Sequence, residues 1–240
     1  MLIGGVEKLS LLDYPDRLSA IVFTQGCNFR CHFCYNPMLV LPNVGGAENK
    51  LKDRLISEDD LLAFLQKRIG KLDAVVITGG EPTINSDLPE FITKIKNLGY
   101  LIKLDTNGTN PDMLNYLINK KLLNYIAMDI KAPLAKYEEV VNVRVDLNKI
   151  QESVKIIKGV KLPYEFRTTV APNFLKLIDV GIMAKELVGA KKWYLQKFES
   201  NKSLVDSKLE NTITYTDQEL ESMAQLGRAI MKNCYYRTYA

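Results

Sequence analysis

Six short apolar segments recur along the chain, and an amphipathic helical pattern follows nearly every one of them. Each segment is a continuous run rich in β-branched residues, which is typical of a strand covered on both faces. A series of strand-then-helix units predicts a parallel sheet with right-handed crossovers. With 240 residues, we expect the α/β class and a partial (β/α)6 barrel rather than the closed eight-stranded form. The expected strands are residues 18–23, 74–78, 100–104, 125–130, 165–170 and 193–198.

Helix start signals stand between these segments. Ser57 is in position to cap a helix, Asp87 with Glu90 three residues later fits a capping box, and Asn110 precedes a proline at the first helical position. Further helical patterns cover residues 147–159, 177–189 and 217–232.

No linker divides the chain, which predicts one domain over residues 1–240. Its core would span about residues 15–200, with a helical extension at about 201–240. Residues 41–52 are the clearest irregular stretch.

Composition excludes several classes of protein. The chain is 47% apolar and 25% charged, and its net charge of +4 comes from 32 basic and 28 acidic residues that are scattered along it. Nucleic-acid binding would favour a concentrated basic face, so we expect no nucleic-acid partner. No apolar run reaches the ~20 residues of a membrane span, and the first residues lack the pattern of a signal peptide. We therefore expect a cytoplasmic protein with thiols or metal ligands instead of disulfides.

Unusual polar residues cluster where the expected strands end. A cysteine-rich segment follows the first strand, Gly79–Pro82 "GGEP" the second, and Asp105–Gly108 "DTNG" the third. Asp129–Lys131 closes the fourth strand and Arg167 lies on the fifth. The carboxyl ends of parallel strands are where such sheets place active sites, so we expect one site built from these segments.

Cys27, Cys31 and Cys34 have the spacing C-x3-C-x2-C. Three thiolates can hold three irons of a [4Fe–4S] cluster and leave the fourth iron open for chemistry, whereas an electron-transfer cluster normally has four protein ligands. The competing interpretation is a Cys3His zinc site with His32, although its ring, between two of the cysteines, is poorly placed to join them. Cys234 is distant in the sequence and is interpreted as a packed or surface thiol.

The cysteine spacing with aromatic Phe33 before the last cysteine, followed by GGEP one strand–helix unit later, resembles the radical S-adenosylmethionine (SAM) superfamily. More narrowly, residues 8–131 are similar to the activating enzymes of glycyl-radical enzymes, above all to the activating proteins of anaerobic ribonucleoside-triphosphate reductase. One departure is Asp16, where that family's "DYPG" stretch has glycine. The departure concerns that turn alone.

The resemblance implies a [4Fe–4S] cluster on the three cysteines and S-adenosyl-L-methionine chelated to the open iron. The contacts to S-adenosylmethionine that it implies are Phe33, Gly79, Gly80, Glu81, Asp105, Asn107, Asp129, Lys131 and Arg167. Alternatives remain for several of these: a tight turn for GGEP, an ion pair between Lys131 and Asp129, and a structural ion pair for Arg167.

Two carboxylates, Asp105 and Asp129, end neighbouring strands and should therefore lie close together. Like charges at that distance need a cation, or one must take up a proton. The resemblance to pyruvate formate-lyase activating enzyme implies a monovalent cation at Asp105, Thr106 and Asp129.

In the family, a reduced cluster passes one electron to the sulfonium and a 5′-deoxyadenosyl radical forms. In an activase, the radical then removes hydrogen from a glycine Cα of the partner. The implied protein is an oxidoreductase with no catalytic residue beyond the cluster and cofactor, and its partners are an anaerobic ribonucleotide reductase and a flavodoxin- or ferredoxin-type electron donor. Two alternatives stay open: a radical SAM enzyme acting on a small molecule, similar to 7-carboxy-7-deazaguanine synthase, and a non-catalytic metal-binding module.

Overall fold

The computed structural model describes residues 1–40 and 55–238, in which two compact units are distinguished. Unit 1 comprises residues 1–28, 38–106 and 110–126, apart from the stretch outside the described residues. Unit 2 comprises residues 29–37, 107–109 and the described residues from 127 onward. The irregular stretch expected at residues 41–52 lies outside the described residues, and the expectation of one domain stays a prediction.

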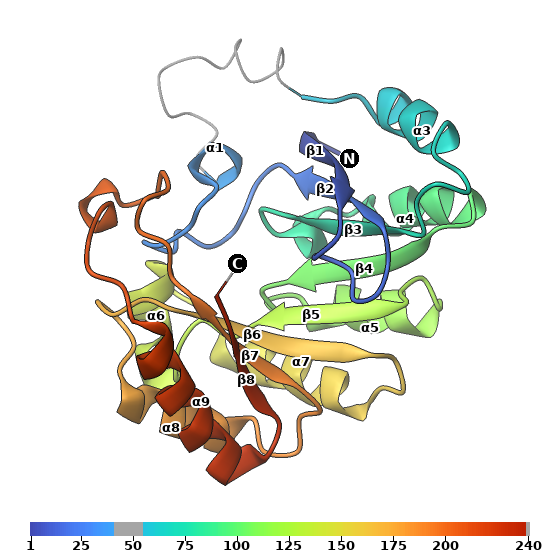
Figure 1. The fold of residues 1–240 in the computed structure, drawn as a ribbon. Helices are drawn as coiled ribbons and strands as arrows, with labels where there is room; N and C mark the ends of the chain where they lie inside the picture. Colours follow the sequence, from blue (N-terminus) through green and yellow to red (C-terminus); the bar gives the residue numbers. More distant parts are fainter. Residues whose placement is uncertain (41–54, 239–240) are drawn as a thin grey trace. The chain divides into compact units, whose positions relative to one another are not determined.

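Eight strands in the described part of the chain follow one another in a sheet in the order β1 to β8 (Figure 1). The pair β1–β2 is antiparallel, whereas β2–β3, β3–β4, β6–β7 and β7–β8 are parallel. The predicted α/β class with mostly parallel strands is confirmed, and the strand order ends at β1 and β8 without closing. The strands are β1 (Ile3–Ser10), β2 (Ser19–Thr24), β3 (Ala74–Gly79), β4 (Leu101–Thr106), β5 (Tyr125–Asp129), β6 (Tyr164–Val170), β7 (Trp193–Lys197) and β8 (Cys234–Arg237).

Helices connect the strands at the predicted places. Ser57 and Asn110 cap their helices as expected, since their side chains accept hydrogen bonds from the Asp60 and Met113 amides at 3.0 and 3.2 Å. The capping box predicted at Asp87 is wrong: its side chain makes no capping bond and pairs instead with the Met1 amino group. The helices are α1 (Pro37–Val40), α3 (Glu58–Gln66), α4 (Leu88–Asn97), α5 (Pro111–Asn119), α6 (Tyr137–Val141), α7 (Leu147–Gly159), α8 (Leu177–Glu186) and α9 (Asp217–Met231), with 3-10 turns η1 (Pro82–Ile84), η2 (Leu134–Lys136) and η3 (Ser207–Leu209).

None of the helices in residues 1–40 and 55–238 combines the length and apolar character needed to cross a membrane.

The core of unit 1 forms where amphipathic helices cover the central strands. Val75, Val76 and Ile77 of β3 are fully buried, as expected for a strand with both faces covered. Helix α4 buries residues 88, 91, 92 and 95, one helical stripe. Each large apolar side chain so buried contributes about 1.5–3 kcal/mol, which holds the strand ends in a fixed register.

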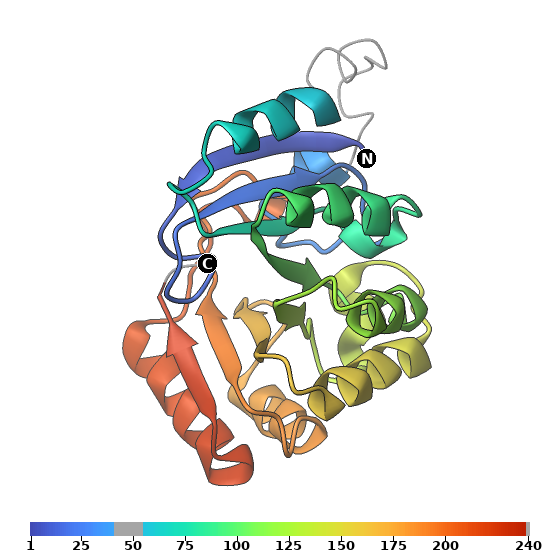
Figure 2. The same ribbon diagram turned by 90° about the vertical axis from the view of Figure 1, so that its right-hand side faces the viewer.

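Two strands were not expected from the sequence. Strand β1 pairs along β2 from Ile3↔Thr24 to Ser10↔Ser19, and α3 runs alongside β1 in Figure 2. Strand β8 lies in the segment expected to be only helical, next to α9 (Figure 1).

A buried ion pair holds β8 in place. Arg237 donates two hydrogen bonds, of 3.1 and 2.9 Å, to the carboxylate of Glu165, and its guanidinium lies 3.4 Å from the ring centroid of Tyr194. Cys234 packs on Gly227 of α9, where an added Cβ would lie 2.5 Å from its sulfur. Cys234 is thus a packed core thiol.

The turn at Asp16 explains the one departure from the family pattern. Asp16 has φ = 60°, in the left-handed region, and the Arg17 amide donates to the Tyr14 carbonyl at 3.2 Å. Proline second and positive φ third are the marks of a type II turn, which favours glycine third. Aspartate is among the residues that tolerate this conformation, so the turn forms despite the missing glycine.

We expect Asp16→Gly to raise the free energy of unfolding by about 1 kcal/mol. The left-handed conformation costs a non-glycine residue about 1–3 kcal/mol, and glycine avoids this cost. Glycine also loses more backbone entropy on folding, which reduces the gain by about 0.5–1 kcal/mol. Urea unfolding of the metal-free protein measures the change. The control Asp59→Gly, in the first turn of α3, should shift the midpoint the opposite way, because glycine weakens a helix.

Candidate active site

The predicted site residues divide between the two units, and most of them end a strand or follow one, whereas Arg167 lies within β6. Unit 1 holds Cys27, Gly79, Gly80, Glu81, Asp105 and Thr106, and unit 2 holds Cys31, Phe33, Cys34, Asn107, Asp129, Lys131 and Arg167. In unit 1 the parallel register pairs Thr24, the last residue of β2, with Gly79, the last residue of β3. The chain therefore leaves both strands at the same edge of the sheet.

Gly79 and Gly80 allow two backbone segments to touch. Gly79 has φ = 110°, and an added Cβ would lie 2.4 Å from the Thr24 nitrogen. At Gly80 an added Cβ would lie 1.8 Å from the Gly26 carbonyl oxygen. Two backbone hydrogen bonds connect the segments: the Gly80 amide donates to the Thr24 carbonyl at 2.9 Å, and the Glu81 amide donates to the Gly26 carbonyl at 2.8 Å. A side chain at either glycine would separate the two segments.

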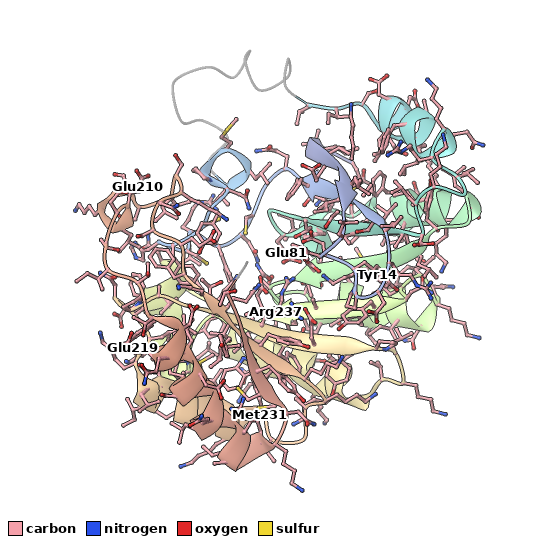
Figure 3. All side chains as sticks on the ribbon, in the orientation of Figure 1. Tyr14, Glu81, Glu210, Glu219, Met231 and Arg237 are labelled. Carbon is pink, nitrogen blue, oxygen red and sulfur yellow. The ribbon has the colours of Figure 1, made fainter. Side chains whose placement is uncertain are left out.

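The carboxylate of Glu81, which follows β3 and is labelled in Figure 3, is held by three donors. Its Oε1 accepts from the Thr83 amide at 3.0 Å, the Thr83 hydroxyl at 2.5 Å and the Thr106 hydroxyl at 2.7 Å. Glu81 is only 1% exposed. Thr106, expected to bind a cation, thus orients a second acidic residue of the site.

Lys103 is a site neighbour that the sequence interpretation missed. It lies two residues before Asp105 on β4, so both side chains point to the same face, and its Nζ is 2.8 Å from Asp105 Oδ1. The side chains of Lys103 and Asp105 are 2% and 8% exposed. A lysine is almost never buried so deeply without a partner. The ion pair with Asp105 is therefore what allows Lys103 to be buried in unit 1.

In unit 2, Asp129 lies between two cations. Arg167 Nε donates to its Oδ1 at 2.8 Å, and Lys131 Nζ donates to its Oδ2 at 2.9 Å. Burial alone would raise the pKa of Asp129, but the charges of Arg167 and Lys131 outweigh it and hold that pKa below its usual value. Burial likewise opposes the charge of Lys131, yet Asp129 and Cys31 raise the pKa of Lys131 overall. The ion-pair alternatives for Lys131 and Arg167 are therefore present in the structure.

The Asn107 side chain stabilises its own turn. Its Oδ1 accepts from the Thr109 amide at 3.0 Å and from the Thr109 hydroxyl at 2.7 Å, and Asn107 is buried. The next carbonyl, of Gly108, accepts from the Ser153 hydroxyl at 2.8 Å. The end of the DTNG segment is thus fixed within unit 2.

The loop with Cys31 and Cys34 is a compact turn in unit 2. The Cys34 amide donates to the Cys31 carbonyl at 3.1 Å, and Phe33 is buried with its ring 6.1 Å from that of Phe174. Burial raises the pKa of the Cys34 thiol, and the Asn36 amide and the charge of Lys131 offset only part of that rise. Binding a metal there would release a proton.

His32, the fourth ligand of the zinc alternative, is engaged through one of its two ring nitrogens. His32 Nδ1 lies 3.1 Å from Asp206 Oδ2, and the ring stacks on Phe174 at 5.2 Å. All four cysteines are thiols rather than halves of disulfides. Within neither unit do the described residues gather three His, Cys, Asp or Glu side chains that could hold a metal ion.

Comparison with known proteins identifies the family. A model described as the radical SAM superfamily matches residues 21–176, more than half of the chain. The chain belongs to the radical SAM superfamily. A protein of Methanocaldococcus jannaschii, described as a candidate glycyl-radical enzyme activating enzyme, is 31% identical over 99% of this chain and 96% of its own length.

Solved structures support the radical SAM fold. SuiB of Streptococcus suis, in a crystal structure bound to S-adenosylmethionine, aligns with a TM-score of 0.65 at 15% identity, over 92% of this chain and 52% of SuiB. A domain of pyruvate-formate lyase-activating enzyme from Bacteroides vulgatus aligns with a TM-score of 0.55 at 12% identity, over 69% of this chain and 99% of that domain. The chain is an enzyme of the radical SAM class.

Membership of this class implies a [4Fe–4S] cluster and S-adenosylmethionine, and the residues present fit both. Thiolates are the donors that iron–sulfur clusters take, and three of them are spaced within eight residues. The glycine contact described above leaves a side-chain-free backbone at the end of β3. These residues are compatible with the group that the family carries.

We expect Gly80→Ala to lower the free energy of unfolding by about 2 kcal/mol or more, because the new methyl group would overlap the Gly26 carbonyl and the backbone must move. Thermal or urea unfolding of the metal-free protein measures this. The matched control is Gly159→Ala at the end of α7, where an added Cβ meets nothing within 4 Å. Equal effects at both sites would contradict the contact.

We expect Lys103→Met to lower the free energy of unfolding by about 3 kcal/mol, because it leaves Asp105 buried without the charge of Lys103. Urea unfolding again gives the value. Lys94→Met removes an exposed ion pair with Glu58 in the same unit and should leave the midpoint almost unchanged. A Lys103 variant as stable as the Lys94 variant would show that the buried pair contributes nothing.

Proposed function

We propose that this radical SAM enzyme is an activase that generates a glycyl radical on a partner enzyme. The observation that carries the proposal is the similarity to the Methanocaldococcus jannaschii protein, which spans almost the whole of both chains. We propose anaerobic ribonucleoside-triphosphate reductase as the partner and a flavodoxin- or ferredoxin-type protein as the electron donor, because residues 8–131 resemble the activating proteins of that reductase.

In this proposal Cys27, Cys31 and Cys34 hold the [4Fe–4S] cluster. The cluster, once bound and reduced, supplies one-electron cleavage of S-adenosylmethionine. The protein contributes binding, orientation and exclusion of water.

The polar residues of the site position the cofactor. Glu81 accepts from its amino group, a role supported by a buried carboxylate that three donors hold in one orientation. Lys131 and Asn107 contact its ribose or carboxylate. Asp129 keeps Lys131 charged and fixes the direction of its ammonium group.

The monovalent cation expected at Asp105, Thr106 and Asp129 stays a prediction. Its electrostatic rationale was two carboxylates of like charge that were expected to lie close together. Lys103 now neutralises Asp105, and Arg167 and Lys131 neutralise Asp129. A cation would have to compete with these side chains.

We expect Cys27→Ala, Cys31→Ala and Cys34→Ala each to abolish cleavage of S-adenosylmethionine, since the cluster loses a ligand. The assay is release of 5′-deoxyadenosine from anaerobically reconstituted, reduced protein. Cys234→Ala is the control: its thiol is fully buried between α9 and β7–β8, so the variant should retain cleavage. Retained cleavage in any of the first three variants would overturn the ligand assignment.

An electron paramagnetic resonance spectrum tests the activase itself. The reduced protein is mixed with S-adenosylmethionine and the organism's anaerobic ribonucleotide reductase. A glycyl-radical doublet on the reductase supports both the activity and the partner. Release of 5′-deoxyadenosine with no doublet would reject this partner and favour the small-molecule alternative.

A further inference from the structure

A segment that follows β7 packs on the loop that carries two of the cysteines, and both belong to unit 2 (Figure 1). The Val205 amide donates to the Cys34 carbonyl and the Asp206 amide donates to the His32 carbonyl, each at 3.0 Å. Two consecutive amides of the segment thus bind two carbonyls of the cysteine turn. These contacts fix the backbone of that turn from outside it.

Asp206 adds a side-chain contact to the same turn. Its Oδ2 lies 3.1 Å from His32 Nδ1, and because a carboxylate only accepts, Nδ1 carries the hydrogen. The His32 ring is stacked on Phe174, which leaves it little freedom to turn. The other oxygen of Asp206 accepts from the Lys208 amide at 3.1 Å and caps η3. Asp206 therefore links the cysteine turn to a folded element.

Tyr35, the residue after Cys34, forms a second anchor. Its hydroxyl oxygen accepts from the Glu199 amide at 2.8 Å, and its ring stacks on Phe198 with the centroids 6.2 Å apart. The Lys202 ammonium lies 4.9 Å from the Tyr35 centroid on its face. The cysteine turn is thus held at both ends by residues 198–206.

The segment has a structure of its own and is no loose tail. The Leu204 amide donates to the carboxylate of Glu210, labelled in Figure 3, at 3.0 Å. The Asn211 amide donates to the Ser200 carbonyl at 2.6 Å, and Leu204 is buried. Such a closed loop can transmit rigidity to what it touches.

We propose that residues 198–210 are a brace for the cluster-binding loop, with Asp206 as a positioning residue that acts through His32. The brace holds the Cys31–Cys34 turn in its ligating conformation and slows the loss of iron. Groups that orient metal ligands in this way tune how tightly the metal is held. The inference rests on the proposed function in one respect, the assignment of Cys31 and Cys34 as cluster ligands.

Amide hydrogen exchange in the metal-free protein tests the brace without a cluster. Asp206→Asn keeps the cap of η3 but presents an amide group to the His32 N–H, and we expect exchange in residues 31–36 to quicken on the order of fivefold. Asp217→Asn is the matched control, because it removes an ion pair with Lys197 in the same unit and leaves the turn alone. Unchanged exchange in residues 31–36 of the Asp206 variant would overturn the brace.

A double-mutant cycle separates positioning from general destabilisation. His32→Phe keeps the ring that stacks on Phe174 and removes the Nδ1 hydrogen. If Asp206 acts through His32, the double variant His32→Phe/Asp206→Asn should exchange no faster than the faster of the two single variants. Effects that multiply would overturn the role of Asp206.

Iron release from the reconstituted protein tests the consequence for the cluster. Iron captured by a chelator should appear on the order of fivefold faster from Asp206→Asn than from wild type or Asp217→Asn. Val205→Pro, which deletes the amide bound to the Cys34 carbonyl, should act in the same direction. Equal rates in all variants would overturn the role in retention. A wild-type protein that takes up no cluster would overturn the ligand assignment, while the exchange experiment would still decide the brace.

Discussion

The close contact between the ends of β2 and β3 is the constraint on which the chemistry of unit 1 depends. Gly80 sits where no Cβ fits, against the Gly26 carbonyl, and the Glu81 amide binds that same carbonyl. The chain runs from this contact directly into Cys27 on one side and into the Glu81 carboxylate on the other. Burial of the apolar side chains of β2 and β3 sets the register of this parallel pair. Because the register is set, the two segments that follow the strands begin at fixed positions. The two glycines, Gly79 and Gly80, are therefore required first of all by the close approach of the two backbone segments.

Charge is balanced locally at the strand ends. Asp105 forms an ion pair with Lys103 of its own strand, and Asp129 forms ion pairs with Lys131 and Arg167. A buried carboxylate without a partner would be expensive, so each acid brings its counter-ion within its unit. The arrangement keeps Asp129 ionised and Lys131 protonated, because each shifts the pKa of the other toward its charged form. The ammonium group of Lys131 in unit 2 therefore stays charged near neutral pH and is held in place by Asp129.

Hydrophobic patterning predicts the strands and helices, and motifs predict the candidate site residues, but neither predicts which groups those residues contact. All six expected strands formed because each is a buried apolar run, whereas β1 mixes glycines with charged residues and β8 is a four-residue edge held by Arg237 and Glu165. Asp87 matched a capping pattern, yet its carboxylate is drawn to an amino group distant in sequence. Lys103 gave no signal, because a lysine inside an apolar run is indistinguishable by pattern from one that reaches water. A backbone contact such as Val205 to Cys34 has no signature in residue types at all.

That last contact changes how the part of the chain after about residue 200 is understood. Its residues carry no motif, so the resemblance that covers residues 8–131 says nothing about them. Yet Val205 and Asp206 supply the amides that satisfy two carbonyls of the cysteine turn. Within the turn the Cys34 amide donates to the Cys31 carbonyl, whereas the His32 and Cys34 carbonyls accept from outside it, so the backbone of the turn is bonded partly to itself and partly to residues 205 and 206. A change in residues 205 and 206 can therefore alter the cysteine turn without any change in the cysteines.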